Sequence, residues 1–465
     1  MAGVAVSAQP SPGALTKVPS DGAALSWLAA GAVSLVAVIA AVASGEGRLF
    51  WAAAVCTAIA TTFAVRPEVG LFFFVLARPV LDVWADRPLA TIGGLQLNAA
   101  SLMALMLIAV GGAYIVERWA VCQRAPALRP FLVFAGLAAV GIPFAPAPAA
   151  ALTEWLRFFS LFVLYAVAFT VVARHGRFGR LAGVVLAAAA VPLIVAVWQT
   201  AHGGSREIAD FGRATGTFLH PDPFGIFVAV VLVFAVPILL SGGRGWRGAL
   251  LLALPVALVA LVGSYTRTGW LALPIGLLVA AAVRNRSLFL LTPLLVVAVA
   301  VAAPSTTTRF NDLSNSRTSF GGPGNSLRAR YDLWRTNVPK IKQNPVAGTG
   351  LKGIAEEEGA FVHSDYVRAA VETGIPGFLA YVWLLIAAVR GCSRGVRRSR
   401  SHGGLAHAVA TGAFATSVVF LVVSADSNLM TQVAVAGTFW AIVAAGHAVG
   451  DLAARGGADE TAPAR

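Results

Sequence analysis

Long apolar runs recur from one end of the chain to the other, and they constrain its fold more than any other feature. The runs near 222–240 and 247–263, for example, carry a charge only at their first residue. A helix of about 20 apolar residues crosses the hydrocarbon core of a bilayer. Hydrophobic residues make up 58% of the chain and charged residues 12%, about half the charged fraction of a soluble protein. The sequence therefore predicts an all-α, polytopic transmembrane helical bundle.

The apolar runs set the number of expected spans. Because several of the runs are short, we expect about 12–14 membrane-spanning helices. The candidates lie near 24–44, 49–65, 68–84, 99–116, 129–146, 155–173, 179–201, 222–240, 247–263, 268–283, 287–304, 368–390, 404–424 and 428–449.

The segments between and beyond these runs divide the chain into five parts. Both ends are rich in small and polar residues and carry no apolar run, which is typical of disordered tails. We expect a disordered tail at 1–23, a transmembrane bundle at 24–304, a large loop at 305–367, C-terminal transmembrane helices at 368–449, and a second disordered tail at 450–465.

The basic residues predict how the chain is oriented. Lys and Arg of the short loops gather on the side that also carries both chain ends, and such loops are cytoplasmic in membrane proteins. The chain is thus expected to be a multi-pass protein of the cytoplasmic (inner) membrane, with both termini cytoplasmic and the 305–367 loop extracytoplasmic. The same rule explains the net charge of +14, so no nucleic-acid partner is expected.

The stretch Gly348–Gly353 (GTGLKG) matches the pattern GxGxxG. A dinucleotide-binding loop also needs a preceding strand, a following helix and a closing acidic residue. No strand-like run precedes it, and the stretch lies in the loop predicted to face away from the cytosol. We therefore interpret these glycines as permitting tight turns and a close approach of the backbone to a neighbouring helix or ligand.

One amphipathic helix is expected inside the large loop. Its apolar residues recur at helical spacing and are flanked by Arg and Lys, and Pro339 should kink its end. Two interpretations remain open: a basic helix at the outer membrane surface, or a solvated loop helix packed on the bundle. The apolar stripe consists of Leu327, Tyr331, Trp334, Val338 and Ile341.

Polar residues that could carry chemistry gather in the segments predicted to face outward. Residues 201–225 include Arg213, His220 and Asp222, and Arg267 interrupts two apolar runs. An ionisable residue close to membrane depth is costly to place and usually functional. Two other pairs, Arg78–Asp82 and Glu154–Arg157, have helical spacing and are interpreted as structural salt bridges.

His363 is the candidate catalytic residue. A histidine accepts protons near neutral pH, and a nearby carboxylate would orient its ring. Asp365 and Glu372 follow it and are candidates for support, together with His220 and Asp222. The three cysteines are scattered without metal-like spacing, and the outer acidic residues form no two-metal pattern, so neither a metal site nor a cofactor is expected.

Taken together and in this order, several of these stretches resemble the O-antigen ligase and O-antigen polymerase family of bacterial membrane proteins. The hydropathy on both sides of the motifs is also compatible with that family. The matching pieces are Gly216–Gly225 (GTFLHPDPFG), Ser264–Gly269 (SYTRTG), Arg328–Trp334 (RARYDLW), Asn344–Gly350 (NPVAGTG), His363–Tyr366 (HSDY) and Glu372–Gly377 (ETGIPG).

The resemblance implies a GT-C-like membrane glycosyltransferase without a nucleotide sugar or metal. Such enzymes take a glycan from a polyprenyl diphosphate on the outer leaflet and transfer it to an acceptor hydroxyl of a glycan, a lipid or a protein. The family's histidine carries over to His363, and its diphosphate-binding arginines to Arg213 and Arg267, with Arg330 as a third candidate. Inversion at the anomeric carbon is expected. The prenyl chain would lie in a groove between helices, and membrane lipids would surround the bundle.

The chain departs from the family pattern at two positions. Family members usually have His-Asn where this chain has His363-Ser364, and Pro-Asn where it has Pro221-Asp222. Ligase and polymerase are not distinguished by the sequence. A transporter or flippase of a small anion or a lipid-linked sugar is the alternative class, although no internal repeat is detectable and the helices are almost free of charge.

Overall fold

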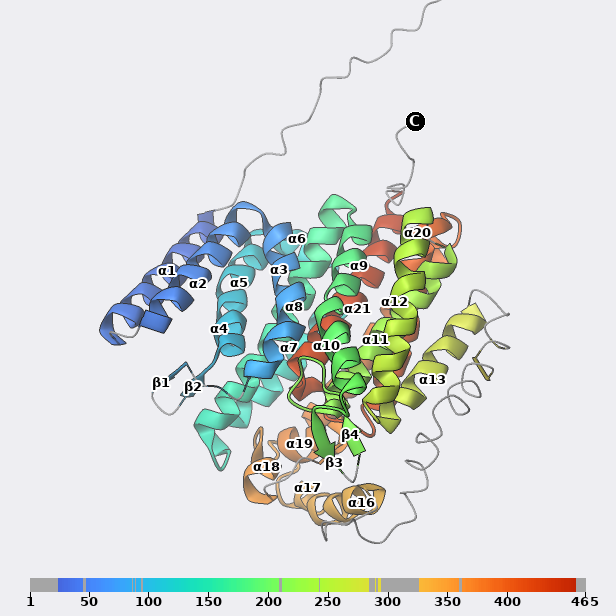
Figure 1. The fold of residues 1–465 in the computed structure, drawn as a ribbon. Helices are drawn as coiled ribbons and strands as arrows, with labels where there is room; N and C mark the ends of the chain where they lie inside the picture. The colour runs from blue at the N-terminus through green and yellow to red at the C-terminus, as the bar shows by residue number, and fades with distance from the viewer. Residues whose placement is uncertain are drawn as a thin grey trace, which may run out of the picture.

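Helices make up nearly all of the regular structure (Figure 1). The computed structural model describes residues 24–44, 47–85, 87, 89–92, 95–208, 211–241, 243–283, 289, 292–293, 326–358 and 362–456. Among these residues, eight helical segments are long and apolar enough to cross a membrane. They are 99–117 (α4 Ala99–Met106, η2 Leu107–Gly111, α5 Gly112–Glu117), α8 Pro148–His175, 178–201 (α9 Phe178–Ala187, α10 Ala190–Ala201), α11 Pro221–Ser241, α12 Arg244–Gly263, α19 Asp365–Ser399, α20 Gly404–Val423 and α21 Val433–Ala454.

Four shorter apolar helices add to these candidates. They lie in α1 Ala24–Ser44, α2 Gly47–Val65, α7 Leu128–Val140 with η3 Ile142–Phe144, and α13 Arg267–Val283. A further helix, α3 Pro67–Leu81, is followed by η1 Asp82–Trp84. Every predicted span except the one near 287–304 coincides with a helix, and that run falls largely outside the described residues. The predicted fold class, an all-α polytopic helical bundle, is confirmed.

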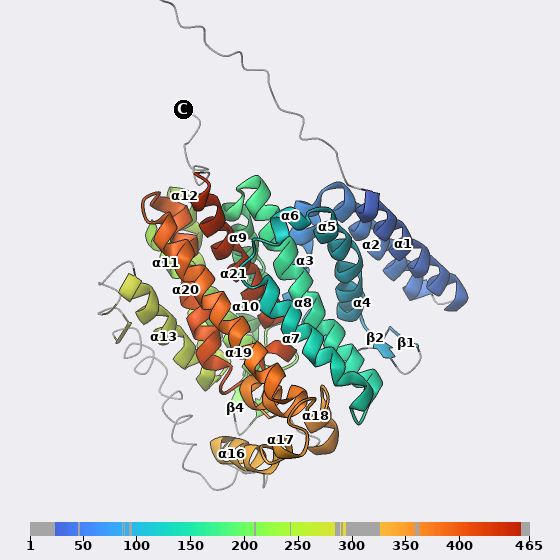
Figure 2. The same ribbon diagram turned by 180° about the vertical axis from the view of Figure 1, so that it is seen from behind.

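Helices α8 and α21 form the centre of the bundle, while α1 and α2 lie at its edge (Figures 1 and 2). Almost every residue of α21 is buried, including Trp440 and Phe439. Edge and outer helices instead expose large apolar side chains such as Leu28, Trp51 and Leu252. Such side chains suit contact with lipid tails, because in a membrane the outer surface of a bundle is as apolar as its core.

Small residues and a buried histidine hold the central helices close together. A Cβ added to Gly395 of α19 would lie 2.5 Å from the Gly446 carbonyl oxygen of α21, so only glycine permits this crossing. His447 of α21 is hydrogen-bonded through Nδ1 to the Tyr165 hydroxyl of α8 (2.8 Å) and through Nε2 to the Ala388 carbonyl of α19 (3.0 Å). The last helix of the chain is thereby fixed to both of its neighbours.

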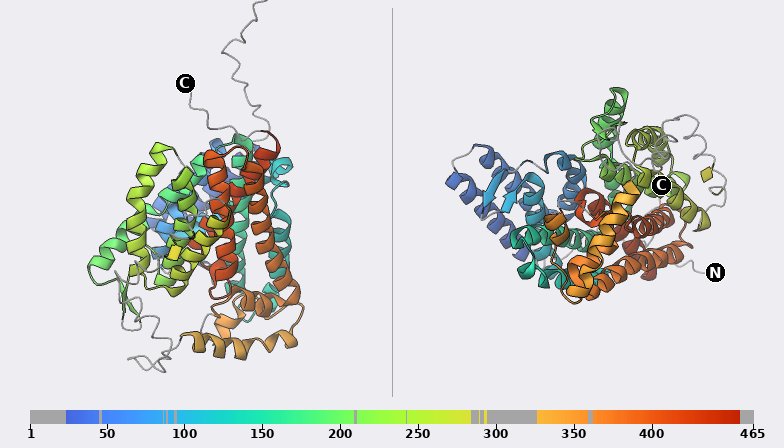
Figure 3. Two further views of the ribbon diagram at one scale, coloured as in Figure 1. Left: turned by 90° about the vertical axis from the view of Figure 1, so that its right-hand side faces the viewer. Right: turned by 90° about the horizontal axis from the view of Figure 1, so that it is seen from below.

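Three short helices cross one end of the bundle (Figure 3). These are α16 Ser326–Asn337, α17 Lys340–Gln343 and α18 Gly353–Glu358. The helix expected over 327–341 is therefore present as two pieces, and they separate at Pro339, where the kink was predicted. Trp334 and Ile341 pack against buried residues of the same end, whereas Tyr331 and Val338 are exposed. This packing favours a helix lying on the bundle, and contact of its exposed side with a membrane surface stays a prediction.

Several boundaries differ from those expected. Helix α19 begins at Asp365, three residues before the predicted C-terminal unit, because Ser364 caps it: its hydroxyl accepts a hydrogen bond from the Val367 amide (3.4 Å). Helix α21 begins at Val433, and a short turn, η5 Leu429–Thr431, precedes it. The remaining elements are α6 Trp119–Cys122 and two hairpins, β1 Ala90–Ile92 with β2 Leu95–Leu97 and β3 Arg206–Ile208 with β4 Phe211–Arg213.

Candidate active site

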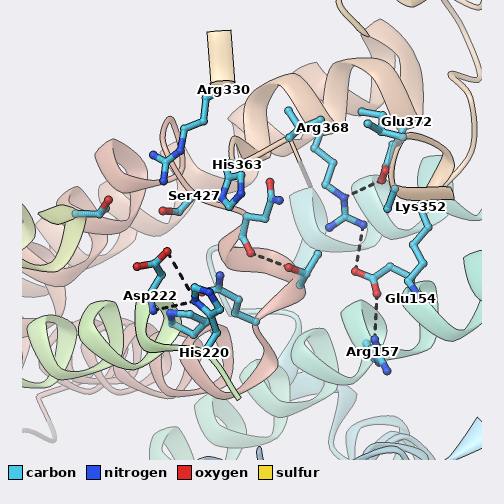
Figure 4. Close-up of a pocket in the computed structure, with 18 residues that line it drawn as sticks. Glu154, Arg157, His220, Asp222, Arg330, Lys352, His363, Arg368, Glu372 and Ser427 are labelled. Atoms are coloured by element: carbon cyan, nitrogen blue, oxygen red, sulfur yellow. Dashed lines mark hydrogen bonds and ion pairs between the residues drawn. The ribbon is translucent and has the colours of Figure 1, made fainter. Parts of the chain in front are cut away.

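A cavity of about 420 Å³ lies at the end of the bundle that α16 and α18 cover (Figure 4). Residues from seven separate stretches of the chain line it, and most of them are charged or polar. They are Glu154, Arg157, His220, Asp222, Pro223, Thr268, Arg330, Lys352, Ile354, Ala355, Val362, His363, Arg368, Glu372, Ser427, Asn428, Thr431 and Gln432.

His363 sits in this cavity on a strained turn. Its φ is +53°, a left-handed conformation that is uncommon for a residue with a side chain. The backbone is held on both sides: the Trp334 indole donates to the Val362 carbonyl (2.7 Å), and the Ser364 amide donates to Asn428 Oδ1 (3.0 Å). Among the described residues the imidazole itself has no hydrogen-bond partner, so it is available to a substrate.

The surroundings of His363 favour its neutral form. The His363 side chain remains accessible from the cavity, but the protein around it partly desolvates the imidazole, and this lowers its pKa. The nearby Arg330 guanidinium lowers the pKa further, against smaller opposing effects of Asp222 and Asp426. A neutral imidazole near pH 7 can accept a proton.

Arg330 reaches the cavity from α16. Its guanidinium pairs with the carboxylate of Asp426, and it also donates to the Asp426 carbonyl at 3.2 Å. Asp426 in turn accepts a hydrogen bond from the Thr268 hydroxyl (2.7 Å). A carboxylate between α20 and α21 thus links the helix over the cavity to the start of α13.

The two other predicted arginines do not line the cavity. Arg213 is only 2% exposed, and its side chain donates to Asp222 Oδ1 (2.5 Å), the Ser264 carbonyl (2.8 Å) and the Thr266 hydroxyl (3.1 Å). It therefore lies behind Asp222 and ties together two of the predicted motifs. Arg267 begins α13 next to the cavity-lining Thr268, and it is half-buried.

His220 and Asp222 both line the cavity, as the sequence suggested for possible supporting residues. The Asp222 amide donates to His220 Nδ1 (3.2 Å) at the start of α11, so the other ring nitrogen carries the proton in the neutral tautomer. Burial lowers the pKa of His220. The carboxylate of Asp222, where the family usually has an asparagine, faces the cavity and partly neutralises Arg213.

Asp365 does not orient the His363 ring, contrary to expectation. Its buried carboxylate accepts hydrogen bonds from the Tyr381 hydroxyl (3.0 Å) and from the amides of Leu429 (3.0 Å) and Met430 (3.3 Å). The two amide donors would have been hard to foresee, because they lie in a turn 64 and 65 residues further along the chain. Asp365 therefore fixes η5 against the start of α19 and supports the cavity wall indirectly.

Glu372 belongs to a buried ion-pair network at the other side of the cavity. Arg368 lies between Glu372 (2.8 Å) and Glu154 (3.1 Å), and Glu154 also contacts Arg157 (3.5 Å). The predicted Glu154–Arg157 pair is thus present, but it is part of a larger arrangement that lines the cavity. Lys352, in a left-handed conformation at φ +61°, completes this side. Its ammonium has no ion-pair partner among the described residues.

Sequence reasoning missed Arg368, Lys352 and Asp426. The helical spacing of Arg368 and Glu372 was a usable signal, since residues four apart share one face of a helix. The pairing of Arg368 with Glu154 spans 214 residues, and no local pattern predicts it. In the part of the chain that the structure describes, no group of three His, Cys, Asp or Glu residues is placed to hold a metal ion.

The GTGLKG stretch packs directly behind this network, as its glycines suggested. Gly348 and Gly350 have φ of +69° and +82°, and the amides of Thr349 and Gly350 donate to the carbonyls of Val371 (2.9 Å) and Glu372 (3.0 Å). A Cβ on Gly348 would lie 2.4 Å from the Glu372 backbone. Close approach to a neighbouring helix is confirmed.

Replacing Gly348 by alanine is expected to destabilise the protein by about 1–3 kcal/mol or more, because the side chain adds left-handed strain and a backbone clash. Thermal unfolding of the purified protein in detergent measures the change. Gly136→Ala is the control, since a Cβ there meets nothing within 4 Å and alanine favours helix. Equal melting temperatures for Gly348→Ala and the wild type would contradict the expectation.

A bundle of apolar helices with a charged cavity at one end defines the class of this chain as a polytopic membrane protein. The family model for O-antigen ligase matches residues 250–382, a region that includes His363, Arg330, Arg368 and Glu372. The match confirms the resemblance to the O-antigen ligase and polymerase family and supports a membrane glycosyltransferase of that type. A comparison with curated proteins found no match.

Proposed function

We propose that the protein transfers a glycan from a polyprenyl diphosphate carrier to an acceptor hydroxyl, with His363 as the general base. The observation that supports this most is the His363 imidazole: it is held on a strained turn, has no hydrogen-bond partner among the described residues, and faces a cavity that also contains cationic groups. Positioned and neutral, it meets both requirements of a general base.

The reaction needs one proton acceptor and one site of positive charge. As the acceptor oxygen forms its bond to the anomeric carbon, His363 takes the hydroxyl proton. The bond from the anomeric carbon to the diphosphate breaks in the same step, and its electron pair leaves with the diphosphate. A single displacement of this kind inverts the configuration at the anomeric carbon.

Arg330 and Lys352 are the cations best placed to stabilise the departing diphosphate. Arginine binds phosphate oxygens with two parallel hydrogen bonds and keeps its charge at every physiological pH. Arg330 pairs with one half-exposed carboxylate, Asp426, whereas Arg157 and Arg368 are paired with the buried carboxylates of Glu154 and Glu372. Because these side chains can supply the charge that the leaving group needs, we assign no metal ion to the reaction. Arg213 contributes its positive charge from behind Asp222, to which it is hydrogen-bonded. Arg267 contributes its charge from the start of α13, next to the cavity.

The basic residues favour an extracytoplasmic site. Helix α19 begins beside the cavity at Asp365 and ends far from it, where Arg394, Arg397 and Arg398 cluster. Figure 1 shows α16–α18 at the opposite end of the bundle from the turn between α19 and α20. Cytoplasmic loops are enriched in Lys and Arg, so we infer that the cavity faces away from the cytoplasm and that the protein spans the inner membrane.

An Arg330→Gln variant tests this assignment. It should bind polyprenyl diphosphate about 10- to 100-fold more weakly, because a hydrogen bond to a charged group is worth about 1.5–3 kcal/mol. The measurement is a titration of the purified protein in nanodiscs, with and without a chelator. Binding should be the same in both, as the assignment involves no metal.

Arg335→Gln is the matched control, since Arg335 lies on the same helix, is exposed and does not line the cavity. A second readout comes from pH. Arg330 lowers the pKa of His363, so the acid limb of the transfer rate should move to higher pH in Arg330→Gln. Equal binding by the wild type and Arg330→Gln would show that Arg330 does not bind the diphosphate. A wild type that binds no polyprenyl diphosphate would contradict the proposed function itself.

A further inference from the structure

A second cavity, of about 300 Å³, adjoins the first. The two share the residues Arg157, His220, Pro223, Thr431 and Gln432 along their common wall. The second cavity extends from there toward α3 and α4, away from Arg330 and Lys352. A ligand that occupies the first cavity could therefore continue into the second without leaving the protein.

Gln432 in the shared wall has an unsatisfied carboxamide. It connects η5 to α21, and its backbone carbonyl accepts a hydrogen bond from the Ala436 amide (2.9 Å). Its side-chain Oε1 is buried without a hydrogen-bond partner among the described residues. A buried polar atom left unpaired destabilises a protein, so such a group needs an explanation, and a ligand in the adjoining cavity supplies one. Gln432 lines both cavities, and the terminal torsion of glutamine is soft, so the carboxamide can reorient toward a ligand.

The rest of the second cavity offers both hydrogen-bonding and apolar surfaces. Arg78 and Asp82 form an ion pair at 3.2 Å on one side, and Thr431 presents a hydroxyl on another. Phe218 and Ala104 contribute apolar walls between them. A sugar ring has hydroxyl groups around its edge and carbon–hydrogen faces above and below, and it matches this pattern. An acyl or prenyl chain does not, because it would offer no hydrogen bond to the Gln432 carboxamide or to the free donors and acceptors of the Arg78–Asp82 pair.

We propose that the second cavity binds a sugar ring of a glycan substrate, and that the Gln432 carboxamide recognises one of its hydroxyl groups. An amide can accept from a hydroxyl through oxygen and donate to it through nitrogen. The volume is at the lower end of the range for ligand pockets, which fits one or two sugar units. Because this assignment rests on the proposed function, the sugar belongs either to the donor beyond its diphosphate or to the acceptor.

The test compares ligands with and without sugar on the full-length protein in nanodiscs. The probes are polyprenyl diphosphate, the same lipid carrying one N-acetylhexosamine, and a free N-acetylhexosamine disaccharide. The variant is Gln432→Met, which keeps the side-chain length and removes the hydrogen-bonding groups. Ala104→Leu fills the cavity without changing a polar group, and Gln343→Ala on the exposed surface of α17 is the control.

For the wild type, the sugar should strengthen binding of the lipid or allow binding of the free disaccharide. Gln432→Met and Ala104→Leu should reduce that sugar-dependent part about tenfold, the equivalent of one good hydrogen bond pair, and leave binding of sugar-free polyprenyl diphosphate unchanged. The unliganded Gln432→Met variant should melt no lower than the wild type, since it loses an unpaired buried group. A purely structural glutamine would instead lower the melting temperature.

The two sources of sugar are separated by which probe responds. Loss confined to the glycosylated lipid assigns the cavity to the donor, and loss confined to the free disaccharide assigns it to the acceptor. A sugar that adds nothing to wild-type binding, or an equal loss for the sugar-free lipid, overturns the assignment. Failure of the wild type to bind any polyprenyl diphosphate is a different result, because it contradicts the proposed function and not the sugar site alone.

Discussion

A His363→Ala variant is expected to bind polyprenyl diphosphate as tightly as the wild type and to transfer glycan about 10²- to 10⁴-fold more slowly. That range is what a positioned general base typically contributes. Binding should survive because the cationic groups are on other elements, Arg330 on α16 and Lys352 before α18. The measurement is transfer of a labelled glycan in proteoliposomes, with a parallel titration of the lipid carrier.

His202→Ala is the matched control, since His202 is an exposed loop histidine. Its ring contacts the Trp198 indole, and its Nδ1 is hydrogen-bonded to the Trp198 carbonyl (2.7 Å). It should keep full activity. Burial and Arg330 lower the pKa of His363, so the wild-type rate should persist as the pH falls through 6.5 and decline only below it. Full transfer by His363→Ala would show that another group takes the proton.

Replacing Arg368 by methionine is expected to destabilise the protein by about 3–5 kcal/mol. The guanidinium is the only cation within ion-pair distance of Glu372 among the described residues, and it also pairs with Glu154. Both carboxylates are almost completely buried. Removing one partner leaves uncompensated charge in the interior, which costs far more than the pair itself contributes. Thermal and chemical unfolding in detergent measure the loss.

The triple variant Glu154→Gln, Arg368→Met, Glu372→Gln separates charge from packing. It removes all three charges together, so much of the lost stability should return. Arg335→Met on exposed α16 should be neutral. A single Arg368→Met variant as stable as the wild type would mean that water or another cation compensates the two carboxylates.

Most of the fold could be predicted because the membrane restricts backbone structure so strongly. Apolar length alone located the helices, since in lipid every backbone polar group must be paired within the helix. Pro339 marked the break between α16 and α17. Helix starts and turns were harder to predict from the sequence. The start of α19 at Asp365 depends on the Ser364 cap, and the turn before α21 depends on hydrogen bonds to the distant carboxylate of Asp365.

The candidate site was predictable in its residue types but not in its arrangement. His363, Arg330 and Asp222 do meet in one cavity. Arg213 was expected to contact the diphosphate directly, yet its hydrogen bonds to Asp222 and Thr266 place it one layer behind. Which arginine faces the cavity depends on how α11 and α13 cross. Gly225 and Gly269 pack against each other at this crossing. Because the contact joins two helices, neither segment alone predicts it.

The supports of His363 also make its position depend on the packing of α21. The Ser364 amide donates to Asn428, and Asp365 accepts hydrogen bonds from the amides of Leu429 and Met430. These three partners lie directly before α21. The turn η5 packs against α21 and α8, so the turn that holds the histidine depends on the packing of α21. Under the proposed function, that packing would be a condition for the general base to be in place.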